Sequence, residues 1–127
     1  MNIQKPNRKA LIDELRLRRV LQKKICEKSF YEFFKRAWEV LEPTIPLVDN
    51  WHIKYLCDLF QGEIHRIGKR QPKTKDIIIN IPPRSFKSSI VSVTLPAWAW
   101  IHYPNLKFIS SSHSKDLSLE HCLSSRD

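Results

Sequence analysis

A lysine and a serine stand just after an isoleucine-rich stretch in the segment IIINIPPRSFKSSIV, residues 77–91. Backbone amides at the start of a helix attract phosphate groups. A lysine placed there can reach the outer phosphates of a nucleotide, and the hydroxyl that follows it can hold Mg²⁺. Lys87 and Ser88 are the candidates for these two roles, so the segment predicts a site for a nucleoside triphosphate.

Two residues depart from the general phosphate-loop pattern, which has glycine at its first position and again before the lysine. Ile81 and Phe86 occupy these positions here. Glycine serves in such loops because backbone close to a phosphate often adopts dihedral angles that a side chain disfavours. We therefore expect ordinary dihedral angles at Phe86, with its ring pointing away. The alternative is a purely structural turn between a strand and a helix.

The elements around this loop predict an α/β fold. Residues 76–81, DIIINI, are too short for a helix and indicate a strand buried on both faces. A helix should follow over residues 87–103 and be bent or broken at Pro96. A second strand at 105–112 and a helix capped by Ser114 complete the order. Strand, loop, helix, strand and helix in succession are typical of a parallel sheet with crossover helices.

Three helices are expected before the first strand. They cover residues 8–28, 29–43 and 51–70; Ser29 caps the second, and Asp49 or Asn50 caps the third. The first is amphipathic with one strongly basic face. The inward positions of the other two are expected to be Phe30, Phe33, Phe34, Ala37, Trp38 and Leu41, and Ile53, Leu56, Cys57, Phe60 and Ile64.

The charge of the chain is positive and uneven. Its 127 residues have a formal net charge of +9, and residues 1–36 hold eleven Lys and Arg against four Asp and Glu. Such an excess attracts phosphate backbones, and it equally serves solubility. No run approaches the roughly 18 apolar residues that span a bilayer, so we expect a soluble intracellular protein. His65 and His102 lack metal-ligand spacing and are expected at the surface.

The segment INIPPRSFKSSIVSVTLPAWAW resembles the N-terminal ATPase segment of the large terminase subunits of tailed bacteriophages and prophages. That family has a deviant Walker A motif of the form P-P-R-x-x-K-S after an isoleucine-rich strand. Some branches have a bulky apolar residue where a glycine often precedes the lysine. The matching residues here are Pro82, Pro83, Arg84, Lys87 and Ser88.

The similarity covers about residues 29–127. The stretch FFKRAWEVLEPTIPLVDNWHIKYLCDLF resembles the helical lead-in of the family, and PNLKFISSSHSKDLSLEHCLSSRD resembles its next strand and helix. The resemblance implies N-terminal helices followed by the start of a P-loop NTPase parallel sheet, an incomplete three-layer α/β/α fold. The chain then divides into a basic helical arm (1–28), a helical lead-in with a basic loop (29–75) and the first part of the ATPase core (76–127).

The resemblance also implies roles for individual residues. Lys87 would neutralise charge on the β- and γ-phosphates of ATP, and Ser88 would ligate Mg²⁺. Arg84 is the candidate catalytic residue, as a sensor or stabiliser of the γ-phosphate, or else it forms an ion pair elsewhere. Trp51 and His52 lie where the family builds part of its adenine pocket, although Trp51 could equally be core. The loop residues implied to surround the nucleotide are Pro83, Arg84, Ser85, Phe86, Lys87, Ser88 and Ser89.

Intact members of this family are ATP-driven motors that package viral DNA into a capsid and cut it with a nuclease domain. The resemblance therefore implies double-stranded DNA, a portal protein and a small terminase subunit as partners, no membrane, a homo-oligomer for the intact protein, and the cytoplasm of a bacterial host.

No apolar strand that ends in paired carboxylates follows Ser89, and no nuclease domain is present in these residues. We therefore expect this chain alone to bind nucleotide weakly and not to turn over ATP. Two other functions stay open: another P-loop DNA translocase of the helicase type, and a non-catalytic module that contacts DNA or a packaging protein.

Overall fold

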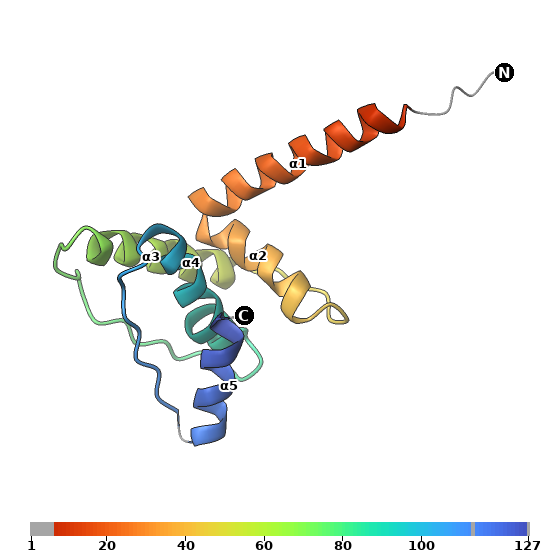
Figure 1. Cartoon of the computed structure of the whole chain (residues 1–127). Coiled ribbons are helices and arrows are strands. Elements are labelled where there is room, and N and C mark those ends of the chain that lie inside the picture. The colour runs from red at the N-terminus through yellow and green to blue at the C-terminus, as the bar shows by residue number, and fades with distance from the viewer. Residues whose placement is uncertain (1–6, 113, 127) are drawn as a thin grey trace.

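The structure is a computed structural model that describes residues 7–112 and 114–126. The elements are α1 (Arg8–Lys28), α2 (Phe30–Leu41), α3 (Trp51–Gly68), η1 (Ser89–Thr94), α4 (Leu95–His102) and α5 (Lys115–Arg126). Figure 1 shows α2, α3 and α4 packed together, while α1 extends away from them. The C-terminal α5 packs against η1, the π-helical turn that precedes α4. No described helix is both long and apolar enough to cross a membrane.

The predicted parallel sheet is wrong, because the described residues contain no β-strand. Residues 76–81 and 106–112 belong to no helix or strand, and neither segment has a ladder of backbone hydrogen bonds to another described segment. A β-strand forms only through such pairing, so isoleucine-rich composition is not sufficient. The described fold is therefore all-helical, and neither an α/β fold nor a P-loop NTPase sheet with helices on both faces is formed.

Residues 77–81 still show the two-residue period of an extended chain. Ile77, Ile79 and Ile81 pack against the core, whereas the side chain of Ile78 is 93% exposed. The expected burial on both faces is therefore wrong, since only one face meets the helices. This segment brings the chain from the end of α3 to the loop before η1.

The core consists of side chains from α2, α3, η1 and α4. Phe30, Phe34 and Trp38 lie on one face of α2, because residues four apart share a helix face. The indole of Trp98 in α4 is fully buried, with its ring centroid 5.5 Å from that of Phe30. α3 contributes the five inward residues that its periodicity predicts, namely Ile53, Leu56, Cys57, Phe60 and Ile64.

The predicted helix caps are confirmed. The Ser29 hydroxyl accepts a hydrogen bond from the Glu32 amide at 3.4 Å, and the Ser114 hydroxyl accepts one from the Leu117 amide at 3.2 Å. Asn50, rather than Asp49, caps α3, because its side-chain oxygen accepts from the Trp51 amide at 2.8 Å. Each cap satisfies an amide that has no partner within its helix.

The distortion expected at Pro96 takes the form of a π-helical turn instead of a break. The chain stays helical from Lys87 to His102 but passes through η1, which ends two residues before this proline. Proline has no N–H to donate and its ring crowds the preceding turn. The Thr94 hydroxyl donates to the carbonyl oxygens of Ser89 and Ile90, at 2.9 and 3.0 Å, so these two groups have an additional partner.

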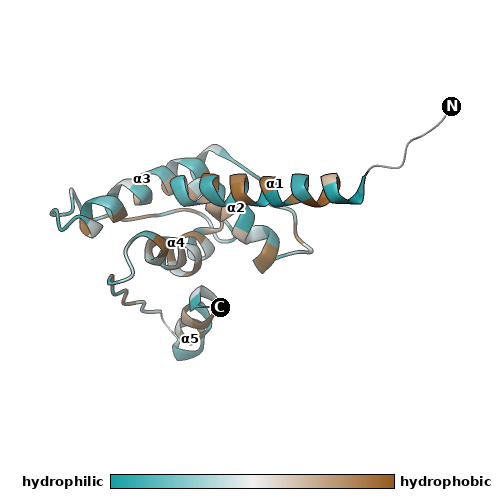
Figure 2. Ribbon diagram, turned by 45° about the horizontal axis from the view of Figure 1, so that its top comes forward, coloured by the Kyte–Doolittle hydropathy of each residue, from teal (hydrophilic) through white to brown (hydrophobic). Residues whose placement is uncertain are grey.

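Side chains of α3 and α4 bind the last turn of α1 through three hydrogen bonds. Trp98 Nε1 donates to the Cys26 carbonyl oxygen at 3.0 Å, and His102 Nε2 donates to that of Glu27 at 2.6 Å. Gln61 Nε2 donates to the Lys28 carbonyl oxygen at 3.0 Å. The last carbonyls of a helix lack partners within it, and here α3 and α4 supply them. No residue of α1 is buried, and Figure 2 shows apolar and polar residues alternating along it.

His65 and His102 are not the surface residues that the sequence predicts. Both are half-buried beside Trp98, and their ring centroids lie 5.6 Å apart. Burial, with smaller effects of His102 and Lys69, lowers the pKa of His65. His65 Nδ1 also lies 2.9 Å from the Tyr103 hydroxyl, so this pair joins α3 to the end of α4.

The two glycines of the chain, Gly62 and Gly68, both lie in α3 and give opposite predictions. A Cβ at Gly62 would meet no described heavy atom within 4 Å, whereas one at Gly68 would lie 2.5 Å from the Tyr103 ring. We expect Gly62→Ala to raise the free energy of unfolding by about 1 kcal/mol, because alanine loses less backbone entropy in a helix. Gly68→Ala should lower it by about 1–3 kcal/mol through the clash. Urea unfolding of both variants measures this, and a loss of stability in Gly62→Ala would contradict the open surface there.

Candidate functional site

The loop before η1 contains two residues in the left-handed region of backbone space. Arg84 has φ of 63° and Phe86 has φ of 60°. Helical structure begins directly afterwards at Lys87, and the Ile90 amide donates to the Phe86 carbonyl oxygen at 2.9 Å. Left-handed residues that alternate with others turn successive N–H groups to one side and form an anion-binding concavity. The positive φ that glycine adopts readily is therefore present at two positions of this loop without glycine.

Phe86 adopts this conformation despite its side chain. A left-handed φ costs a non-glycine residue about 1–2 kcal/mol. The ring packs edge-on against that of Trp38, with the centroids 4.8 Å apart and the planes at 85°. Such aromatic pairs contribute about 0.5–1.5 kcal/mol beyond the area they bury, which offsets much of the backbone cost. The expected ordinary dihedral angles at Phe86 are therefore wrong, and contact with the core explains how the residue is accommodated.

A cavity of about 680 Å³ opens at this loop. Trp38 from α2 and Ile45 from the connector between α2 and α3 form part of its wall, and residues 81–89 form the rest. The volume falls in the range of about 300–1,000 Å³ that is usual for small-molecule sites. All seven loop residues that the resemblance implies around a nucleotide line this one cavity: Pro83, Arg84, Ser85, Phe86, Lys87, Ser88 and Ser89.

The cavity is positively charged. Arg84 and Lys87 are both exposed, and neither forms an ion pair within the described ranges 7–112 and 114–126. The alternative role of Arg84, as partner of a carboxylate, is thus not observed there. The lining residues include no Asp or Glu. Two cations at a cavity without carboxylates favour an anionic ligand.

Ser88 is the second helical residue after the loop and its side chain is exposed at the cavity. A hydroxyl there suits a Mg²⁺ ion that is held mainly by phosphate oxygens and water. The described residues contain no cluster of three or more His, Cys, Asp or Glu arranged around a metal position. The role of Ser88 as a Mg²⁺ ligand stays a prediction.

Trp51 and His52 lie next to the loop cavity and not in it. Both line a separate hollow of about 240 Å³ against residues 77–81, and Ile81 lines the two cavities alike. Trp51 is 76% exposed, so it is not a core residue. His52 Nε2 is buried and has no hydrogen-bond partner in the described part of the chain. Their role in binding adenine stays a prediction.

A polar cluster ties the residues before Trp51 to α2. The Tyr31 hydroxyl donates to the carboxylate of Asp49, and this hydrogen bond raises the pKa of Tyr31 to about 12. Lys35 Nζ lies 4.4 Å from the centroid of the Tyr31 ring. Sequence reasoning misses this cluster, because Tyr31 and Asp49 are 18 positions apart and no periodicity pairs them.

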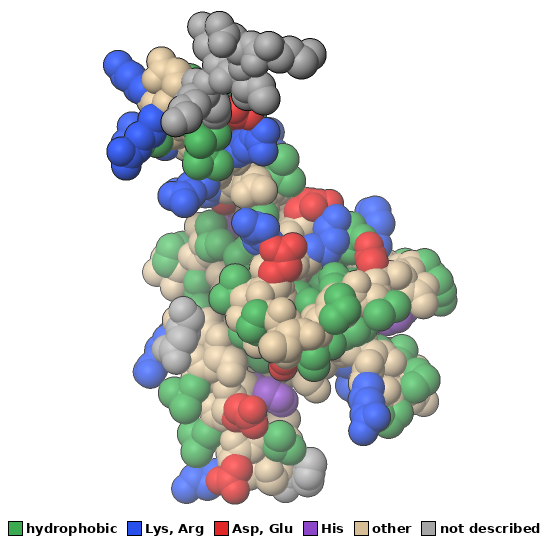
Figure 3. Space-filling view, turned by 90° about the vertical axis from the view of Figure 1, so that its right-hand side faces the viewer, with side chains coloured by type: hydrophobic (Ala, Val, Ile, Leu, Met, Phe, Trp, Pro, Cys, Tyr) green, Lys and Arg blue, Asp and Glu red, His purple; other side chains and the backbone are tan. Residues whose placement is uncertain are grey.

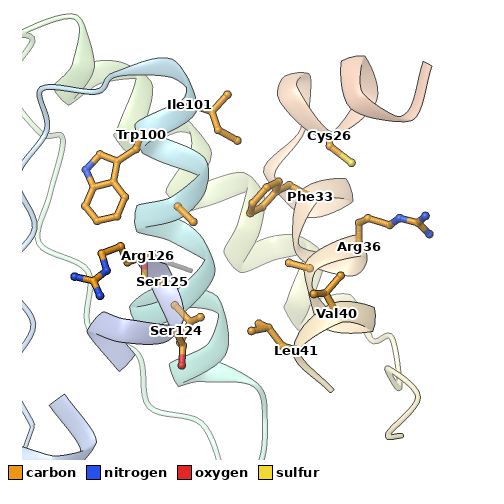
Figure 4. Close-up of a pocket in the computed structure, with 13 residues that line it drawn as sticks. Cys26, Phe33, Arg36, Val40, Leu41, Trp100, Ile101, Ser124, Ser125 and Arg126 are labelled. Carbon is orange, nitrogen blue, oxygen red and sulfur yellow. The ribbon is translucent and has the colours of Figure 1, made fainter. Parts of the chain in front are cut away.

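A second hollow, of about 550 Å³, lies between α2, α4 and the end of α5 (Figure 4). Phe33 and Leu41 on α2 point toward α4, which contributes Trp100 and Ile101 to the lining. None of the residues predicted to bind nucleotide or metal lines this hollow. The cavity at the loop is therefore the candidate site.

Comparison of the chain with protein-family models, with curated proteins and with solved structures finds no match. The candidate site therefore depends on its own residues and geometry.

Arg84 allows the loop conformation to be tested. Because its φ is 63°, a Cβ costs stability at this position, and glycine should be better tolerated than alanine. We expect the free energy of unfolding of Arg84→Gly to exceed that of Arg84→Ala by about 1 kcal/mol. Lys54, exposed within α3, is the control: there glycine should be worse than alanine by about 1 kcal/mol. Denaturant unfolding of the four variants measures both differences, and the same order at both positions would disprove the left-handed conformation.

Proposed function

We propose that the cavity at residues 81–89 binds the phosphates of ATP together with Mg²⁺, and that the chain is the N-terminal part of a phage or prophage terminase large subunit. The observation that carries the proposal is the pair of left-handed residues, Arg84 and Phe86, directly before Lys87 at the start of a helix. The P-P-R-x-x-K-S motif supports the family. The proposed phosphate site depends on the geometry of this loop and not on a sheet.

Each polar group of the loop has a distinct task in this proposal. Lys87 supplies a compact positive charge for the outer phosphates, and Arg84 supplies a planar set of donors that suits a terminal phosphate. The concave run of amides binds phosphate oxygens, and the Ser88 hydroxyl completes the shell of Mg²⁺. Mg²⁺, when bound, neutralises part of the phosphate charge.

Hydrolysis of ATP needs a group that orients or deprotonates water, commonly a carboxylate or a glutamine. No acidic side chain lines the cavity. We therefore propose that these residues bind ATP without turning it over, and that the complete motor supplies the missing groups. Double-stranded DNA, a portal protein and a small terminase subunit are its proposed partners, in the bacterial cytoplasm.

Lys87→Ala tests the nucleotide site. Loss of one charge-assisted hydrogen bond costs about 1.5–3 kcal/mol, so the dissociation constant of a fluorescent ATP analogue should rise by about 10- to 150-fold in the presence of Mg²⁺. Lys107→Ala is the control, since this exposed lysine lies outside the cavity and its loss changes the net charge equally. Equal losses in both variants would show non-specific attraction and refute the site, as would absence of binding by the parent protein.

The exposure of α1 favours a second function, binding of DNA. The helix carries eight Lys and Arg against three Asp and Glu, and none of its residues is buried. Figure 3 shows Lys and Arg side chains spread over the part of the molecule that α1 forms. A surface of this kind binds phosphate backbones through release of counterions, with little dependence on base sequence.

Arg16, Arg19 and Lys23 test this second function, because a spacing of three and four places them on one face of α1. Replacement of all three by Gln should weaken binding of duplex DNA and flatten the slope of log K against log salt by up to about 3. Fluorescence anisotropy at several salt concentrations measures the slope. The matched control replaces three exposed lysines outside α1, Lys69, Lys75 and Lys107, by Gln. If both triple variants behave alike, α1 is not the DNA-binding surface.

A further inference from the structure

We propose that Trp38 is a positioning residue for the phosphate loop, because its ring holds Phe86 in the left-handed conformation before any ligand arrives. The inference rests on the proposed function for the identity of the ligand. The loop conformation itself can be measured without a ligand, so the two ideas can fail separately.

The loop has few other constraints. Residues 81–86 belong to no helix or strand. Within the described residues, these six residues form one backbone hydrogen bond, from the Ile90 amide to the Phe86 carbonyl oxygen. This bond belongs to the helix that follows. A strained backbone conformation persists only where its surroundings fix it. The edge-on contact between the rings of Phe86 and Trp38 can fix the left-handed conformation of Phe86.

Trp38 is itself held firmly. Its indole N–H donates to the Ile45 carbonyl oxygen at 2.8 Å, and its ring lies 6.3 Å from that of Phe34, centroid to centroid. Only 7% of the residue is exposed. Although Trp38 forms part of the cavity wall, it offers little surface to a ligand. Its influence on binding therefore passes through Phe86.

Preorganisation explains how this contact affects affinity. A loop already held in its binding conformation loses less entropy when the ligand binds. In ordinary phosphate loops glycine permits the left-handed conformation but does not fix it. Here a phenylalanine anchored to the core fixes it instead. Phe86→Gly, which restores the usual residue, should therefore weaken binding of nucleotide.

The test combines a double-mutant cycle with a matched control. We expect Trp38→Leu and Phe86→Gly each to weaken binding of Mg²⁺ with a fluorescent ATP analogue by about tenfold, and the double variant to bind no more weakly than either. Trp38→Phe, which keeps an aromatic ring, should recover most of the affinity. Phe30→Leu is the control, since Phe30 is fully buried on the same face of α2, packs against Trp98 and does not line the cavity. It should bind as the parent does while losing stability.

A second measurement needs no ligand. Backbone chemical shifts from nuclear magnetic resonance report φ, so they should show a left-handed residue 86 in the parent and in Phe30→Leu, but not in Trp38→Leu. If Trp38→Leu does not fold, Phe86→Leu takes its place, because it removes the aromatic ring on the loop side of the same contact.

Three outcomes would overturn the proposal: unchanged shifts in Trp38→Leu, tighter binding by Phe86→Gly than by the parent, or additive losses in the double variant. If the parent binds no nucleotide, the proposed function fails, and the chemical shifts still decide whether Trp38 positions the loop.

Discussion

The indole N–H of Trp98 donates to the carbonyl oxygen of Cys26, 72 positions earlier in the chain, and four helices meet around this bond. The ring is fully buried; it contacts Phe30 at the start of α2, His65 in α3 and His102 in its own helix. Loss of so large a buried aromatic ring typically costs about 3–5 kcal/mol. Here it would also leave a carbonyl of α1 without its donor. The core and the attachment of α1 therefore depend on the same side chain.

The same core extends to the candidate site along α2. Phe30 contacts Trp98, Phe34 follows one turn later, and Trp38 after it meets Phe86 of the loop. The spacing of four residues puts all three aromatic rings of α2 on one face. The loop of residues 81–86 is thus packed against the core of the protein, although it has no regular secondary structure of its own. Its conformation depends on tertiary contact more than on the local sequence.

The sequence predicts the helical part of the structure well, because helices are set by local patterns. The inward residues of α3 and the caps at Ser29 and Ser114 follow from spacing and residue type alone. The prediction of two β-strands is wrong for the complementary reason. Isoleucine at residues 77–79 gives a preference for extended backbone, but a strand needs a partner that no local pattern supplies. The sheet is accordingly absent from the described residues.

The loop shows a similar division between local and tertiary information. Lys87 and Ser88 are placed correctly at the start of a helix, because the residues before them signal a turn. The left-handed conformation at Phe86 is missed, since single-residue preference argues strongly against it. What permits it is an aromatic residue 48 positions earlier, and only the fold brings the two rings together. The aromatic row on α2 is the one signal that could have suggested such a partner.

The attachment of α1 by its final turn makes this helix a lever. A helix of 21 residues is about 32 Å long at 1.5 Å per residue. Rotation by only about 10° at the three carbonyls that hold it would swing the far end by roughly 5 Å, given that length. Small rearrangements around Trp98, His102 and Gln61 would therefore become large displacements at Arg8. By the same geometry, a small force that a partner applies at the far end of α1 would exert a large torque where this helix is attached to the core.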